Sequence, residues 1–195
     1  MTELFSRIES TSALDGPSDS IRDTIRKLTS GSAGALLRGD IAPGHPLHPA
    51  LVTVPIGTWT AALLFDFAFG KPHAARQLIG VGLAAAVPTI MTGWTDFAEC
   101  TPVQRRVGLV HAAVNATGVS LLGLSYLGRR RGPRPAAVAA STAGTALIGL
   151  GGLLGGHLAY VLGARVEQVE QHGGVRQHGG GTAAGVVPAR ESTQS

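Results

Sequence analysis

Four long stretches without a charged side chain run through this sequence of 195 residues. They hold 25 residues between Asp40 and Asp66, 19 between Arg76 and Asp96, 22 between Arg106 and Arg129, and 30 between Arg134 and Arg165. The apolar core of a bilayer is about 30 Å thick, and a helix crosses it with roughly 20 apolar residues. Each stretch is therefore long enough to form one membrane-spanning helix.

We place the four predicted spans near Leu51–Phe69, Ala75–Trp94, Val107–Leu127 and Ala137–Leu162. A water-soluble bundle also contains apolar runs, but its helices carry a polar stripe that recurs about every 3.6 residues. Residues 136–156 have no such stripe, because Ser141, Thr142 and Thr145 are their only polar side chains. The sequence thus predicts an all-α integral membrane protein, an up-down antiparallel four-helix bundle.

Composition and motifs exclude several other classes of protein. Only 14% of the residues are charged, whereas an ordinary soluble domain carries about 25%. Cys100 is the single cysteine, which excludes a disulfide scaffold and any site built from two or more thiolates. The sequence has no nucleophile elbow and no phosphate-binding loop followed by lysine, so it offers no catalytic residue to name.

The chain divides into three predicted regions. Residues 1–40 contain no apolar run of the signal-peptide kind, and we expect a partly flexible segment with one short amphipathic helix there. This helix would start at Pro17–Asp19 and end near Gly31. Residues 41–166 form the transmembrane domain. Residues 167–195 repeat Gln-His-Gly-Gly and then drift into small residues, so we expect a disordered tail.

The loops predict an orientation in the cell membrane. The connection 129–134 packs four arginines into six residues and should stay cytoplasmic, because basic loops face the cytoplasm. With four spans, both termini are then extracytoplasmic. Glycines of the fourth span recur in two small-xxx-small pairs, Gly151 with Gly155 and Gly152 with Gly156. Such pairs favour close helix packing, either within the bundle or in a homodimer.

In an up-down bundle, the start of the first span, the end of the second, the start of the third and the end of the fourth meet at one membrane face. The conspicuous polar residues fall at this face. They are His45 and His48 before the first span, Asp96 after the second, His111 and Asn115 near the start of the third, and His157 near the end of the fourth. Ionisable groups inside a membrane are costly and count as hypotheses of function.

Three main interpretations of these residues remain open, besides the transfer of protons or ions. In the first, His111 and His157 are axial ligands of a haem b iron, with Asn115 as a supporting hydrogen-bond partner. In the second, His45 and His48 bind a transition metal together with Asp96 and His111. In the third, the histidines satisfy hydrogen bonds between helices.

Several motifs resemble a known family. They are Gly44-His45-Pro46-Leu47-His48-Pro49, Gly93-Trp94-Thr95-Asp96, Arg105-Arg106-Val107-Gly108, and Gly155-Gly156-His157-Leu158-Ala159-Tyr160. Over about residues 40–166, the chain resembles the DUF2231 family of predicted bacterial membrane proteins of unknown function. The resemblance implies a four-helix membrane domain. Some members of the family are fused to a Rieske-type iron–sulfur domain, and the resemblance therefore implies a redox partner of this kind.

The leading hypothesis from the sequence is a haem- or metal-binding component of membrane electron transfer, which passes electrons to a partner such as a Rieske-type iron–sulfur protein. The alternative is a non-catalytic membrane scaffold or assembly factor, whose histidines make hydrogen bonds between helices. The pI near 10 comes largely from arginines that flank the spans. Such residues face anionic lipid, so we expect the bilayer rather than nucleic acid as the partner.

Overall fold

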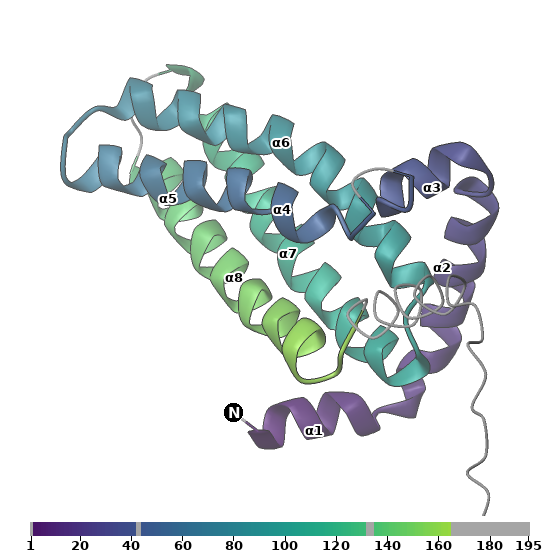
Figure 1. Ribbon diagram of the computed structural model, residues 1–195. Helices are drawn as coiled ribbons and strands as arrows, with labels where there is room; N and C mark the ends of the chain where they lie inside the picture. Colours follow the sequence, from purple (N-terminus) through teal and green to yellow (C-terminus); the bar gives the residue numbers. More distant parts are fainter. Residues whose placement is uncertain (1, 42–43, 132–134, 165–195) are drawn as a thin grey trace, which may run out of the picture.

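The computed structural model describes residues 2–41, 44–131 and 135–164 (Figure 1). The predicted tail lies outside these residues. The described chain is helical and contains no strand, which confirms the all-α class. The α-helices are α1 (Thr2–Ser10), α2 (Asp15–Leu28), α3 (Ser32–Arg38), α4 (His48–Leu51), α5 (Thr53–Phe67), α6 (Pro72–Ala98), α7 (Pro102–Gly128) and α8 (Pro135–Tyr160), with 3-10 turns η1 (Ser12–Leu14) and η2 (Arg129–Arg131).

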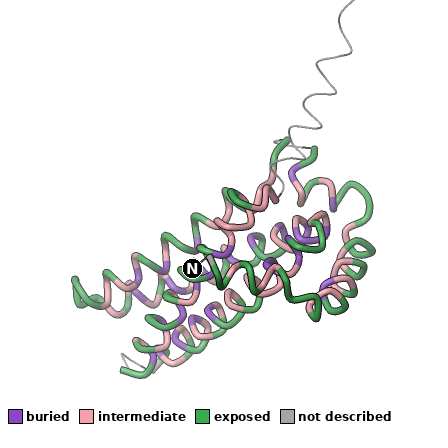
Figure 2. Tube along the Cα trace, turned by 90° about the horizontal axis from the view of Figure 1, so that it is seen from below, coloured by how far each residue is buried: buried purple, intermediate pink, exposed green. Residues whose placement is uncertain are grey.

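Four of these segments are long and apolar enough to cross a membrane, as predicted. The first consists of α4 and α5 together, His48–Phe67, and the others are α6, α7 and α8. They run side by side in alternating directions (Figure 1). Buried positions lie along their inner sides and exposed positions along their outer sides (Figure 2). The chain is thus a multi-pass membrane protein.

The second and third spans extend beyond the predicted limits. Helix α6 continues through Asp96 to Ala98, and α7 begins before Arg105 and Arg106. The predicted limits were set at the charged residues, because a charge was taken to mark the end of a span. Both arginines instead bind groups of the N-terminal helices, so α7 continues through these two charges. Pro102 at the first turn of α7 and the capping box of Thr101 with Gln104 fix where α7 starts.

Glycines bring α7 and α8 into close contact. A methyl group added at Gly118 would lie 2.9 Å from the carbonyl oxygen of Gly144, and one added at Gly144 would lie 2.8 Å from that of Gly118. Gly151 is equally restricted, since its added methyl group would lie 2.2 Å from the Asn115 side chain. Nothing lies within 4 Å of such a group at Gly152. Close backbone approach of this kind drives helix association in lipid.

Helices α1, α2 and α3 form an N-terminal collar, residues 2–38, at one end of the bundle (Figure 1). The predicted amphipathic helix is α2, which begins at Asp15 and ends at Leu28. Helices α1 and α3 were not predicted. They contain only 9 and 7 residues, and helices this short are marginal unless they pack against other structure.

A buried ion pair joins three spans at the opposite end of the bundle. Two guanidinium nitrogens of Arg129 donate to the two carboxylate oxygens of Asp66, at 2.7 and 2.6 Å. The side chains of Arg129 and Asp66 are only 2% and 4% exposed. Arg129 also donates to the hydroxyls of Ser125 and Ser141. Each of the three guanidinium nitrogens of Arg129 therefore donates to a side chain of α5, α7 or α8.

Replacing the acid of this pair should destabilise the bundle. In Asp66→Ala, the Arg129 guanidinium stays buried without its carboxylate, and breaking a buried pair from one side costs about 3–5 kcal/mol. We expect a loss of this size in the free energy of unfolding, measured by denaturant titration of the protein in detergent. Lys71→Ala, at an exposed position of the same end, is the control. Equal stability of the two variants would contradict the role of the pair.

Candidate functional site

The imidazole rings of His48 and His111 lie next to each other inside the bundle. Their centroids are 6.5 Å apart and their planes are nearly perpendicular, at 80°. His48 is the first residue of α4, and His111 lies in the third turn of α7. Two residues that are 63 positions apart in the sequence thus bring two imidazole side chains to one place in the membrane domain.

Each ring is fixed by a backbone carbonyl of another span. Nδ1 of His48 lies 2.9 Å from the carbonyl oxygen of Thr89 on α6, and Nδ1 of His111 lies 2.8 Å from that of Gly151 on α8. A carbonyl oxygen only accepts hydrogen bonds, so Nδ1 must carry the proton in both rings. When the ring is neutral, its lone pair is therefore on Nε2.

Glycines on α6 and α8 make room for the two rings. A methyl group added at Gly93 would lie 2.9 Å from Cε1 of His48, and one added at Gly155 would lie 3.1 Å from Cε1 of His111. The motifs that contain Gly93 and Gly155 thus provide the space in which the histidines sit. The first span, α6, α7 and α8 all contribute to this place, which we call the histidine pair site.

Asn115 completes the surroundings of His111. Its amide nitrogen donates to the backbone oxygen of His111 at 2.9 Å and also lies 3.1 Å from Nε2 of the same residue. An amide nitrogen carries two hydrogens, so it can donate to both acceptors. Nε2 of His48 has no hydrogen-bond partner among the described residues. The site therefore offers one lone pair without a partner and one that accepts from a neighbouring amide.

His157 faces the collar rather than the histidine pair. Its Nε2 lies 2.6 Å from a carboxylate oxygen of Glu9, and its ring stacks on Phe5 with centroids 4.1 Å apart. Six residues separate Gly151, which binds His111, from His157, a distance of about 9 Å along α8. The structure thus brings His111 to His48, and it directs the other predicted axial ligand, His157, toward α1.

The predicted metal ligands His45, His48 and Asp96 are not gathered in one cluster. His45 is exposed, and its Nδ1 contacts the adjacent Pro46 carbonyl at 3.3 Å. Asp96 is half-buried near the end of α6. Among the described residues, no group of three or more His, Cys, Asp or Glu side chains is placed to hold a metal ion.

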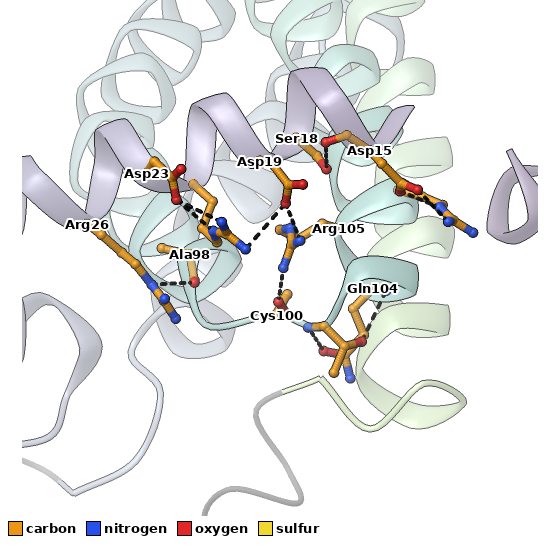
Figure 3. Close-up of polar contacts among 12 residues, drawn as sticks. Asp15, Ser18, Asp19, Asp23, Arg26, Ala98, Cys100, Gln104 and Arg105 are labelled. Carbon is orange, nitrogen blue, oxygen red and sulfur yellow. Dashed lines mark hydrogen bonds and ion pairs between the residues drawn. The ribbon is translucent and has the colours of Figure 1, made fainter. Parts of the chain in front are cut away.

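Acidic residues of the collar bind the arginines at the start of α7. Arg106 donates to both carboxylate oxygens of Asp15, at 2.6 and 2.7 Å. Arg105 donates to Asp19 of α2 and to the carbonyl oxygen of Cys100 (Figure 3). Sequence reasoning missed these contacts. The available signal was charge complementarity, since the N-terminal segment is rich in acids and the second loop carries two adjacent arginines.

These contacts predict that docking of the collar depends on pH. The hydrogen bond from Arg106 lowers the pKa of Asp15 below its ordinary value of 3.8. A lowered pKa means that the ion pair stabilises docking fully above this ordinary value, and that the stabilisation is lost as the pH falls through the lowered pKa.

We therefore expect faster proteolysis of residues 1–30 in the detergent-solubilised protein at pH 3 than at pH 7, measured with an acid-tolerant and a neutral protease against a fully unfolded standard. Asp15→Asn should weaken docking at pH 7 and reduce the difference between the two conditions. An Asp15→Asn protein with the wild-type pH response would contradict this role of the carboxylate.

Comparison with known proteins assigns the chain to a family. Neither the curated proteins nor the solved structures gave a match to the chain. The family model of predicted membrane proteins DUF2231 matches residues 44–168. The matched region includes all four spans and both rings of the histidine pair site. The chain therefore belongs to the DUF2231 family of predicted membrane proteins.

Proposed function

We propose that this protein is a membrane-embedded redox component, in which His48 and His111 bind a transition metal, either a single ion or the iron of haem b. The observation that carries the proposal is the fixed pair of imidazoles at 6.5 Å, each with Nδ1 bound to a backbone carbonyl. Ligating histidines usually have their second nitrogen bound to a carbonyl or carboxylate in this way.

The chemistry of the donors limits the kind of metal. Imidazole nitrogen suits iron, copper, nickel and zinc, and histidine is a common protein ligand of haem iron. A site with two protein ligands leaves further positions to porphyrin, water or a substrate. Asn115 would release Nε2 of His111 on metal binding and keep its bond to the backbone oxygen.

The proposed cellular role is electron transfer to a partner protein, such as a Rieske-type iron–sulfur protein. We also propose that the chain lies in the cell membrane with the arginine-rich connection 129–134 in the cytoplasm, because basic loops stay on that side. The histidine pair site would then lie nearer the extracytoplasmic face. Labelling of a cysteine introduced at Lys71, in a chain that also carries Cys100→Ser, with an impermeant reagent in intact cells, tests this orientation: strong labelling from outside contradicts it.

Single substitutions should separate the ligands from the other histidines. We expect His48→Ala and His111→Ala each to remove most of the bound metal or haem. His157→Ala and His73→Ala should retain it, because His157 faces α1 and His73 is exposed at the other end of α6. The measurement is metal content by mass spectrometry together with the absorption spectrum, on protein purified in detergent from cells supplied with haem and transition metals.

The same variants identify the alternative pairings. Loss of a Soret band in His157→Ala, with retention in His48→Ala, would assign the haem to His111 and His157. Loss of metal in His45→Ala or Asp96→Asn would assign it to the set of His45, His48 and Asp96. A colourless wild-type protein without stoichiometric metal contradicts a metal-binding function at any of these residues.

A second candidate function is a non-catalytic membrane scaffold or assembly factor. Two observations favour it: both Nδ1 atoms make hydrogen bonds between helices, and Gly152 and Gly156 have no atom within 4 Å of an added methyl group. The second observation leaves a small-residue surface on α8 against which another copy of the chain would pack.

If the scaffold is a homodimer through this surface, Gly152→Leu should weaken self-association at least tenfold, because a large side chain holds the two backbones apart. Energy transfer between labelled copies in vesicles measures this association. Gly57→Leu is the matched control, since Gly57 also has open space around it and lies on a different helix, α5. Equal association of wild type and Gly152→Leu rules out this surface as the interface.

A further inference from the structure

An open groove of about 630 Å³ lies between the collar and α6. Its walls are predominantly apolar and come from three helices: Ile21, Ile25 and Leu28 of α2, Leu37 of α3, and Met91 and Trp94 of α6. The groove is separate from the histidine pair site, none of whose histidines lines it.

The groove lies near the end of the second membrane-spanning helix, α6. Met91 and Trp94 belong to the last turns of α6, which ends at Ala98, and tryptophan side chains favour the boundary between lipid and water. Helix α2 crosses the end of the bundle there (Figure 1), and its apolar side chains line the groove together with those of α6. Leu28 is 78% exposed and Met91 is 49% exposed, so the groove continues into an apolar outer surface.

A cation that forms no ion pair within the described part of the chain lies beside this groove. Ser20 and Thr24 line the groove, and Lys27 lies on the same face of α2, because positions 20, 24 and 27 recur at the helical period. Lys27 is exposed and forms no ion pair with a described residue. The neighbouring Arg26, in contrast, donates to the carbonyl oxygen of Ala98 (Figure 3) and to a carboxylate oxygen of Glu99.

We infer that this groove is a binding site for an anionic phospholipid, with an acyl chain between α2 and α6 and the phosphate at Lys27. Apolar walls match the chain, and the single cation at the rim matches the headgroup. Helices with an apolar face and basic residues bind at the lipid–water boundary in this way. Arg22 and Arg26 engage Asp19, Asp23 and Glu99, which leaves Lys27 as the cation of α2 for the phosphate.

Quenching of tryptophan fluorescence tests the site directly. The chain contains only two tryptophans. Trp94 lines the groove, whereas Trp59 is 2% exposed in the core. Wild-type protein in detergent is titrated with phosphatidylglycerol or phosphatidylcholine whose acyl chains carry bromine, and Trp94→Phe identifies the signal of Trp94. We expect phosphatidylglycerol to quench Trp94 at a concentration about fivefold lower than phosphatidylcholine, the factor expected from one cation near an anionic headgroup.

Lys27→Gln should raise the half-quenching concentration of phosphatidylglycerol about fivefold and leave that of phosphatidylcholine unchanged. Lys71→Gln, which removes an exposed cation at the other end of the bundle, should change neither. Leu37→Glu should weaken quenching by both lipids, because it places a charge in the groove. Equal quenching by the two lipids, or an unchanged response in Lys27→Gln, overturns the headgroup assignment. Absence of Trp94 quenching overturns the acyl-chain site.

Discussion

The structure depends on one constraint: a polar group inside a bilayer must find its partner within the protein, because lipid offers none. The peptide groups form their hydrogen bonds within the helices, and the few polar side chains form theirs between helices. Arg129 and Asp66 neutralise each other and bind two serines. His48 reaches a carbonyl on the second span, and His111 reaches one on the fourth. These contacts connect all four spans, whose outer surfaces are apolar.

The unequal lengths of the spans explain the collar. Helices α6 and α7 have 27 residues, or about 40 Å, whereas the first span has 20 residues, or about 30 Å. The ends of α6 and α7 therefore extend past the start of the first span and carry Arg105 and Arg106 with them. Helices α1 and α2 cover this extension and supply the acids that bind the two arginines. His157 and Glu9 tie α1 to the end of α8 in the same way.

Much of this architecture could be predicted from the positions of the charges. The gaps between them located four spans, and the alternation of directions placed His48, His111 and His157 toward one end. Rotation of each helix about its axis could not be predicted, because spans that are apolar all round give no preferred inner face. That rotation decides that His111 faces His48 and that His157 faces α1. The second and third spans were predicted too short because a charge was taken as the end of a span, whereas Arg105 and Arg106 of α7 face the collar.

The proximity of the two imidazoles is the strongest argument that the histidine pair site has a function beyond packing. Either ring alone would make its bond to a backbone carbonyl, whatever side chain stood beside it. An apolar neighbour would avoid the cost of desolvating a second polar ring. Stability of the bundle thus explains each hydrogen bond but gives no reason for two imidazoles at 6.5 Å. A shared ligand gives that reason, because it needs two nitrogen donors that reach one point from different helices.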